Sequence, residues 1–279
     1  MTTLLHAGLS YQVRGVLFHV HTALGPLLKE AYYRDAVALG LRKHGITCDV
    51  EQGFEVLYEG ERVGLYYVDV WIEHGKILLE LKVAPAFTPL HKAQAISYLK
   101  VTNADLAMLV NYGKKSLEAE RLPNFVKHAP SEDFVWRQPP VDPQWLYPEL
   151  VNTVQRACYR VHFTLGTGFL TQIYRRAVMI EFRRQGLGYE YIKHLPVEYE
   201  GHMLGQQEVR LIVVAGKIVV AAFARQHLDE SLRQEFTMRL RRLRLTFGML
   251  VNFYGTAPNI EMVRRPTKEN KRKRRSTAD

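Results

Sequence analysis

The sequence predicts an α/β protein built of two tandem domains, each with a mixed central sheet flanked by helices. Three observations predict it: an internal repeat at a fixed offset, an amphipathic helical stripe early in the repeat unit, and strand-like alternation after its second helix. The chain has 279 residues, of which 47% are hydrophobic and 24% charged. These are the proportions of a globular protein with room for about two domains.

The internal repeat becomes visible when the sequence is shifted by 141 residues. Five blocks then align without a gap, which chance does not explain. They are VHTALG with VHFTLG (from Val20 and Val161), YRDAV with YRRAV (Tyr33 and Tyr174), YEG with YEG (Tyr58 and Tyr199), GKI with GKI (Gly75 and Gly216) and MLVN with MLVN (Met108 and Met249). We expect domains at 8–120 and 150–263, a proline-rich linker over 121–149, and a basic disordered tail over 264–279.

Each element of the repeat unit has a local signal. In the first copy, an i, i+3, i+4, i+7 stripe of an amphipathic helix is formed by Val13, Val16, Leu17 and Val20. A second helix is expected from Pro26 to His44, since Gly45 follows it. Alternation and turn residues then predict strands near 54–58, 63–73, 76–82 and 106–110, a two-residue turn at His74 and Gly75, and a helix over 89–102.

The charge and the pattern of apolar residues limit the classes of protein to which the chain can belong. Lys and Arg exceed Asp and Glu by ten, which favours a polyanionic partner such as nucleic acid. The segment 264–279 supplies six of these charges and is either a solvated tail or a nucleic-acid arm. The longest apolar stretch, Leu211–Phe223, is too short for a membrane helix, and the first residues form no secretory signal. We therefore expect a cytoplasmic protein without membrane contact.

The predicted hairpin around His74 and Gly75 brings charged side chains together. If these two residues form the loop, opposed positions sum to 149 and Asp69 lies directly across from Glu80. Lys82 shares that face, because strand side chains alternate with a period of two. Carboxylates at this spacing repel each other, and a divalent cation would remove the penalty. Asp69 and Glu80 are therefore candidate ligands for Mg²⁺ or Mn²⁺.

A metal ion with an adjacent ammonium is suited to phosphodiester hydrolysis. The ion polarises the phosphate and lowers the pKa of a bound water, while Lys82 orients that water or stabilises the developing charge. The alternative is a solvent-facing strand on which Asp69, Glu80 and Lys82 are simply polar.

Two predicted helices add polar candidates to this site. His91, Gln94 and Tyr98 share one face of the helix over 89–102. Gln94 could hold a water, and Tyr98 or His91 could contact a phosphate oxygen. On the earlier helix, Glu30 is a candidate carboxylate and Tyr33 a candidate nucleic-acid contact. Each of these residues could instead belong to an ordinary polar helix face.

Taken in order, Asp69, the Glu80-Leu81-Lys82 strand and the segment from Gln94 to Tyr98 resemble the D…ExK…QxxxY pattern of the PD-(D/E)xK nuclease superfamily. The resemblance implies two restriction-endonuclease-like domains. More narrowly, LGPLLKEAYYRDAVALGLRKHGI, LLELK and TPLHKAQAISYLK are similar to GxxExxY proteins, over about residues 10–128. Leu27 stands where the first glycine of that motif is expected, and Val68 precedes the aspartate; neither departure removes a ligand.

The resemblance also implies roles for individual residues. Asp69 and Glu80 would bind the metal together with the Leu81 carbonyl, and Lys82 would activate the nucleophile. Glu30, Gln94 and Tyr98 would complete the site, and Glu30 would be a further metal ligand.

The second copy lacks this residue set. At the same offset the counterparts of Asp69, Glu80, Lys82, Gln94 and Glu30 are Arg210, Ala221, Phe223, Glu235 and Thr171. Arginine has no lone pair to offer a cation, so we expect this copy to be inactive. Its last helix carries a basic set that is either a phosphate-binding surface or a solvated face: Arg233, Arg239, Arg241, Arg242 and Arg244.

These observations together predict a Mg²⁺-dependent nuclease that acts on DNA, with one active and one degenerate copy paired as an intramolecular pseudo-dimer. A homo-oligomer is left open. Two other classes remain as alternatives, namely a noncatalytic nucleic-acid clamp and a scaffold that recruits another protein.

Overall fold

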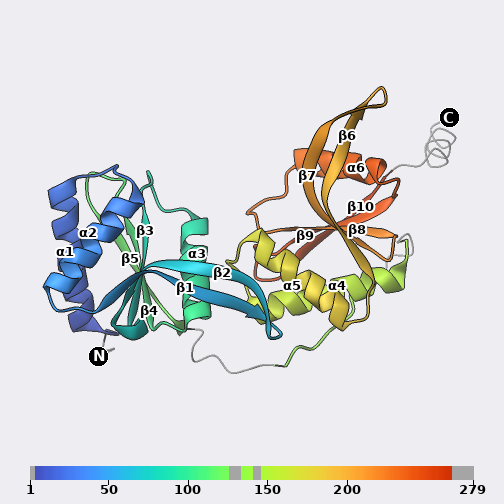
Figure 1. Ribbon diagram of the computed structural model, residues 1–279. Coiled ribbons are helices and arrows are strands. Elements are labelled where there is room, and N and C mark those ends of the chain that lie inside the picture. Colours follow the sequence, from blue (N-terminus) through green and yellow to red (C-terminus); the bar gives the residue numbers. More distant parts are fainter. Residues whose placement is uncertain (1–3, 126–132, 141–145, 266–279) are drawn as a thin grey trace, which may run out of the picture. The chain divides into compact units, whose positions relative to one another are not determined.

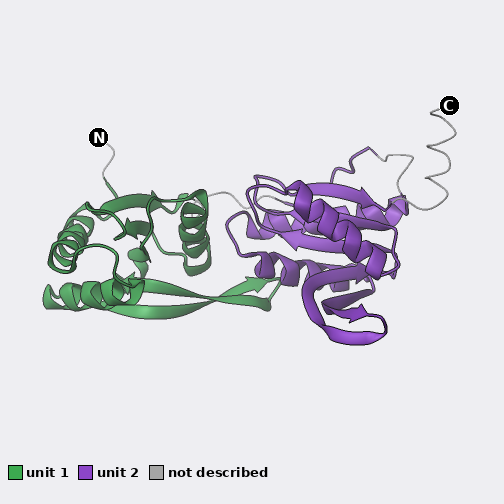
Figure 2. Cartoon of the chain, turned by 90° about the horizontal axis from the view of Figure 1, so that it is seen from above, with its two compact units in different colours: residues 1–132 green, residues 133–279 purple. Residues whose placement is uncertain are grey.

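The computed structural model describes residues 4–125, 133–140 and 146–265. It divides the chain into two compact units, Met1–Glu132 and Asp133–Asp279 (Figure 2). The tail predicted to be disordered, apart from its first two residues, and parts of the predicted linker lie outside the described residues. No helix in the described part of the chain combines the length and apolar character that a bilayer crossing requires.

The first unit is a five-stranded mixed sheet with helices on both faces (Figure 1). Its elements are α1 (Ala7–Leu24), α2 (Glu30–Lys43), β1 (Cys48–Tyr58), β2 (Glu61–Ile72), β3 (Ile77–Lys82), α3 (Pro89–Thr102), β4 (Leu106–Asn111) and β5 (Glu118–Pro123). The strand order is β1-β2-β3-β4-β5. Only β3 and β4 pair in parallel, because α3 crosses over between them.

The second unit repeats this arrangement element by element. It contains α4 (Pro148–Leu165), α5 (Thr171–Arg184), β6 (Tyr189–Tyr199), β7 (His202–Val214), β8 (Ile218–Phe223), α6 (Glu230–Arg242), β9 (Phe247–Asn252) and β10 (Asn259–Arg264). Every α-helix and strand of the first unit has a counterpart that begins 141 positions later. The sheet has the equivalent order β10-β9-β8-β7-β6, and β8 and β9 form its parallel pair. The predicted α/β fold with two mixed sheets is confirmed.

Strand β3 lies in the middle of the first sheet, and its two faces have different surroundings. Ile77, Leu79 and Leu81 belong to the apolar core that α1 and α2 form with one face of the sheet. The alternate residues, including Glu80, face the side covered by α3, which lies on the opposite side of the sheet from α1 and α2 (Figure 1). The strand therefore carries a charged residue into a buried position.

The prediction that the second helix begins at Pro26 is wrong, because α2 begins at Glu30. Gly25 and Leu27 have positive φ angles of 68° and 70°, which a helix cannot include. Leu27 thus occupies a left-handed conformation that favours glycine, and its counterpart in the second unit is Gly168, with φ 101°. The loop is held by the Tyr33 hydroxyl, which donates to the Gly25 carbonyl at 2.7 Å.

The turn between β2 and β3 is longer than predicted. The strands end at Ile72 and resume at Ile77, so four residues rather than two connect them, with a 3₁₀ turn over Glu73–Gly75. The predicted register is nevertheless correct, since Val70 pairs with Leu79 and Ile72 with Ile77. A longer turn at the same register leaves the facing residues unchanged.

Two edge strands had no clear sequence signal. Strands β5 and β10 are neither fully buried nor alternating, since nearly all their residues have intermediate exposure. Part of the predicted linker also packs on the second unit, where the Trp136 ring lies 5.3 Å from that of Tyr159 and its Nε1 donates to Asn152 Oδ1 at 3.1 Å.

The turn glycines provide a stability test with an internal control. Gly75→Ala should lower the free energy of unfolding by about 2–4 kcal/mol, because φ is 98° and a Cβ atom would lie 2.6 Å from the Trp71 ring. The counterpart Gly216→Ala should cost only about 1 kcal/mol, since φ is 64° and no atom lies within 4 Å. Urea denaturation measures both values, and equal losses would contradict this account of the turn.

Candidate active site at the end of strand β3

Glu80 is the most deeply buried carboxylate of the candidate site, with 2% of its surface exposed. It lies on β3 between Leu79 and Leu81, which are fully buried, and it faces the side of the sheet covered by α3. A carboxylate in such a position loses its hydration and must be compensated by neighbouring groups.

Lys82 supplies the first of these groups. Its Nζ lies 2.5 Å from Glu80 Oε1, as expected for two residues on the same face of a strand. Burial opposes the charged form of Lys82, but attraction to Glu80 outweighs it and raises the lysine pKa above its ordinary value. Lys82 is therefore an ammonium that points at the buried acid.

Asp69 joins the cluster from β2, by a different geometry from the one predicted. The β2–β3 ladder ends at the pair of Val70 and Leu79, so Asp69 is not a ladder partner of Glu80. Its carboxylate instead accepts a hydrogen bond from the Leu81 amide, with Oδ2 2.7 Å from that nitrogen. The side chain thus takes the place of the missing backbone partner, and it is held at the point where the two strands separate.

Asp69 repels the charged form of Glu80, as predicted. Burial raises the pKa of Glu80 to about 8, and repulsion from Asp69 contributes in the same direction, while Lys82 opposes both. Burial also raises the pKa of Asp69, against the Leu81 hydrogen bond and the charge of Lys82. A cation between these groups would relieve the repulsion.

Helix α3 covers the cluster with Gln94 and Tyr98. Gln94 Nε2 donates to the Tyr98 hydroxyl at 2.9 Å, and the Tyr98 ring packs edge-on against Tyr66 of β2 with centroids 5.1 Å apart. Burial and the nearby charge of Glu80 both raise the pKa of Tyr98, so its hydroxyl stays protonated. The structure therefore brings Gln94 and Tyr98 to the same face as the acids.

Glu30 is close to the cluster but is held by the backbone. Its Oε1 accepts from the amide of Val83, at 3.1 Å, directly after β3. Within residues 4–125, 133–140 and 146–265, no three His, Cys, Asp or Glu side chains form a group that could hold a metal ion. The structure thus shows Glu30 bound to the backbone next to the cluster, and its role as a further metal ligand stays a prediction.

His91 and Tyr33 have structural contacts of their own. His91 forms a capping box with Thr88 at the start of α3: its backbone N–H donates to Thr88 Oγ1, and its Nδ1 accepts from the Thr88 N–H, both at 3.3 Å. Tyr33 is fully buried and stacks on Tyr112 with ring centroids 4.1 Å apart. Because a buried ring cannot contact nucleic acid, the expectation that Tyr33 does so is corrected.

The arginines of α6 do not form a single basic face. Arg233 is paired with Glu261 and Glu230, and Arg239 is paired with Glu235. The three that are exposed lie at or just after the end of the helix: Arg241, Arg242 and Arg244. Arg242 donates to Gln207 Oε1 at 2.9 Å.

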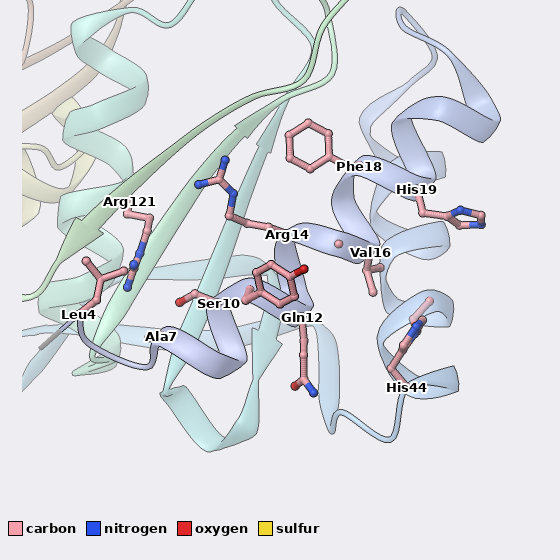
Figure 3. Close-up of a pocket in the computed structure, with 13 residues that line it drawn as sticks. Leu4, Ala7, Ser10, Gln12, Arg14, Val16, Phe18, His19, His44 and Arg121 are labelled. Carbon is pink, nitrogen blue, oxygen red and sulfur yellow. The ribbon is translucent and has the colours of Figure 1, made fainter.

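A cavity of about 970 Å³ in the first unit lies away from this cluster. Figure 3 shows it along α1, where its lining includes Ser10, Phe18 and His44 but none of the clustered acids. In the second unit, Trp136 packs against Tyr159, the counterpart of Phe18. The volume of a cavity therefore does not by itself identify the candidate active site.

Comparison with known proteins agrees with this description of the fold. A family model for the PD-(D/E)XK nuclease superfamily matches the chain twice, over residues 7–122 and 148–265. The chain belongs to the PD-(D/E)XK nuclease superfamily. The two matches coincide with the two repeats, so the predicted superfamily and its tandem arrangement are confirmed, and each unit has the restriction-endonuclease-like fold of a nuclease family.

No curated protein matches the chain. The solved structure titled "Crystal structure of SSO0001" is 15% identical and aligns with a TM-score of 0.24, over 43% of this chain and 79% of its own.

The cluster has the chemistry of a divalent-metal site in a PD-(D/E)XK protein. Mg²⁺ is usually held by one or two carboxylates, with water and substrate phosphate filling its other positions. Asp69 and Glu80 provide such a pair, and the charge of Asp69 contributes to the raised pKa of Glu80. The residues present therefore fit a divalent metal ion of the kind that PD-(D/E)XK nucleases use.

The buried acid predicts a pH dependence of stability in the metal-free protein. The folded-state pKa of Glu80, about 8, lies above its ordinary value of 4.5. The stabilisation of the protonated form is therefore complete below about pH 4.5, and it is lost as pH rises through about 8, with a slope of up to about 1.4 kcal/mol per pH unit. Denaturation in EDTA at pH 5, 6.5 and 8 measures this loss.

Glu80→Gln should flatten that slope, because glutamine does not ionise. The exposed Glu55→Gln is the matched control and should keep the slope of the unmodified protein. If Glu80→Gln and the unmodified protein have parallel profiles, Glu80 is ionised throughout, and the account of its environment is wrong.

Proposed function

We propose that this protein is a metal-dependent nuclease that hydrolyses phosphodiester bonds of DNA in its first repeat, and that its second repeat is catalytically inactive. The observation that carries the proposal is the cluster of Glu80, Asp69 and Lys82 where β2 and β3 separate. Within the superfamily, the helix and strand motifs support an assignment to GxxExxY proteins.

In this proposal the metal is Mg²⁺ or Mn²⁺, held by Asp69, Glu80 and the Leu81 carbonyl. Such an ion, when bound, would supply Lewis acidity toward the scissile phosphate and the attacking water. The Leu81 amide holds the Asp69 carboxylate in place through a hydrogen bond. Glu30, by binding the Val83 amide, fixes the backbone that follows Lys82.

Lys82 supplies a positive charge rather than a base. Its pKa is raised by Glu80, so it is protonated at neutral pH and donates hydrogen bonds. An ammonium in this place orients the attacking water and stabilises the negative charge that develops on the phosphate. Gln94 and Tyr98 complete the polar wall, with the amide free to turn toward a water and the protonated hydroxyl able to donate to a phosphate oxygen.

The second repeat supports the other half of the proposal. Ala221, Phe223 and Arg210 replace the acids and the lysine, which leaves no carboxylate pair at the equivalent place. We assign it a binding role through Arg241, Arg242 and Arg244, which are exposed, and we assign His91 of the first repeat a phosphate contact. The net charge of +10 is consistent with a nucleic-acid substrate.

Cleavage assays test the proposed activity directly. With Mg²⁺ or Mn²⁺, the unmodified protein should cut DNA, Glu80→Ala should reduce the rate at least about 10³-fold, and Lys82→Ala should reduce it roughly 10²–10³-fold, because each removes charge at the reacting phosphate. Single-stranded, duplex and branched DNA and RNA are compared by gel analysis.

Lys92→Ala is the matched control, since this lysine is on α3 and pairs with Glu120 away from the acids. It should keep the unmodified rate. Metal-dependent cutting that survives in both Glu80→Ala and Lys82→Ala would place the active site elsewhere. Tight binding with no cutting of any substrate would instead favour a noncatalytic clamp.

The salt dependence of binding tests the role of the second repeat. Each phosphate contact adds roughly 0.9 to the slope of log K against log salt on duplex DNA. The double variant Arg241→Gln/Arg244→Gln should therefore reduce that slope by roughly 1–2, as measured by fluorescence anisotropy. Arg62→Gln, which removes a charge paired with Glu55 in the first unit, should leave it unchanged. An unaltered slope in the double variant counts against the binding role.

A further inference from the structure

The second unit contains a cavity of about 550 Å³ where the first unit has its acid cluster. The correspondence follows from the 141-residue offset: the cavity is lined by the counterparts of the candidate site residues, namely Thr171, Arg210, Ala221, Phe223 and Glu235. One backbone contact is also retained, since Thr171 Oγ1 accepts from the Ala224 amide at 3.0 Å, as Glu30 does from Val83. Loss of the acids has therefore not filled the pocket.

The residues that line this cavity are mainly basic, whereas the corresponding site of the first unit contains acids. Four arginines from different elements reach it: Arg175 from α5, Arg210 from β7, Arg225 after β8 and Arg239 from α6. One acid lines it, Glu235, which is already paired with Arg239 at 2.5 Å. We call this set the arginine pocket.

Arg175 is the residue that most needs an anionic partner. It is 7% exposed, and its guanidinium lies 5.9 Å from the ring centre of Tyr191, but no carboxylate within the described residues is paired with it. Burial lowers the pKa of Arg175, and the charge of nearby Arg210 adds to this effect. A buried cation without a counter-ion is costly, so a bound anion would stabilise the pocket.

The first repeat shows what has been removed. Arg34, the counterpart of Arg175, is paired with both Asp35 and Glu51. In the second repeat these two acids are replaced by Arg176 and Ile192. The arginine has thus been kept while both of its intramolecular counter-ions have been lost. An unmet donor also lies in the same pocket, because Arg239 Nε is buried without a hydrogen-bond partner among the described residues.

We propose that the arginine pocket binds a phosphate group. Guanidinium groups bind phosphate through paired, parallel hydrogen bonds, and several converging arginines favour a dianion over a carboxylate. A volume of about 550 Å³ admits a phosphate with an attached sugar and base. The phosphate is carried by a nucleotide or a nucleic-acid strand, or it is free in solution. The pocket is independent of catalysis in the first repeat, so it goes beyond the proposed nuclease activity.

Calorimetric titration of the full chain tests this proposal with four probes: inorganic phosphate, deoxythymidine 5′-monophosphate, and one oligonucleotide with either a 5′-phosphate or a 5′-hydroxyl. At least one phosphate-bearing probe should bind the unmodified protein. Arg210→Gln and Arg175→Gln should each weaken it about 10-fold or more. Arg210 is only half-buried, so its variant should fold, and circular dichroism checks Arg175→Gln.

Arg183→Gln is the matched control, since this exposed arginine of α5 does not line the pocket. It should leave the affinity for inorganic phosphate and for the mononucleotide unchanged. Glu80→Ala should also bind normally, so that failure of the proposed nuclease activity and failure of this site are separable outcomes.

The comparison of probes identifies the source of the phosphate. Preference for the 5′-phosphorylated strand, lost in Arg210→Gln, assigns the pocket to a strand end. Equal binding of both strands, weakened by Arg210→Gln, assigns it to an internal backbone phosphate, and binding of the small probes alone assigns it to a free phosphate or nucleotide. The proposal is overturned if no probe binds, or if the pocket variants and Arg183→Gln weaken binding of the small probes equally.

Discussion

The burial of Glu80 beside Lys82 and Asp69 is the constraint on which the candidate site depends. A central strand of a mixed sheet is normally apolar on both faces, and burial of a carboxylate there costs stability. The fold does not require the acid, because Ala221 occupies the same position in the second unit within an intact sheet. We therefore propose that Glu80, which is unfavourable for folding and present in one repeat alone, serves chemistry.

Comparison of the two repeats separates structural residues from functional ones within a single sequence. The tyrosine that closes the loop before the second helix is kept in both, with Tyr174 donating to the Gly166 carbonyl at 2.6 Å as Tyr33 does to Gly25. Asn111 and Asn252 likewise both accept a backbone amide 27 residues upstream at 3.0 Å. Around the pocket, Asp69, Glu80 and Lys82 of one unit are replaced by Arg210, Ala221 and Phe223 of the other. Two further arginines, Arg225 and Arg239, stand where the first unit has Ala84 and Tyr98. The repeats therefore share a framework and differ in the charge of the site that it holds.

Much of the fold and of the candidate site could be predicted from the sequence, because each element of one repeat has a counterpart in the other. The offset of 141 residues is kept by every α-helix and strand, and the register of the hairpin follows from its opposed positions. What could not be predicted depended on backbone details and on burial: the left-handed Leu27 that delays α2, the early end of the β2–β3 ladder that turns Asp69 toward the Leu81 amide, and the burial of Tyr33. The arginine pocket was missed because its residues are far apart in the sequence, although the aligned YRDAV and YRRAV blocks already place Arg175 opposite Arg34.

The central claim is that Asp69 and Glu80 hold a divalent metal ion beside Lys82. The most direct measurement is anomalous diffraction from crystals of the protein soaked in Mn²⁺. The account predicts an anomalous peak within about 2.0–2.3 Å of carboxylate oxygens of both Asp69 and Glu80 and of the Leu81 carbonyl, and no peak at Ala221 of the second unit. A structure in which Mn²⁺ is bound elsewhere, while both carboxylates remain without it at saturating concentration, would contradict the account.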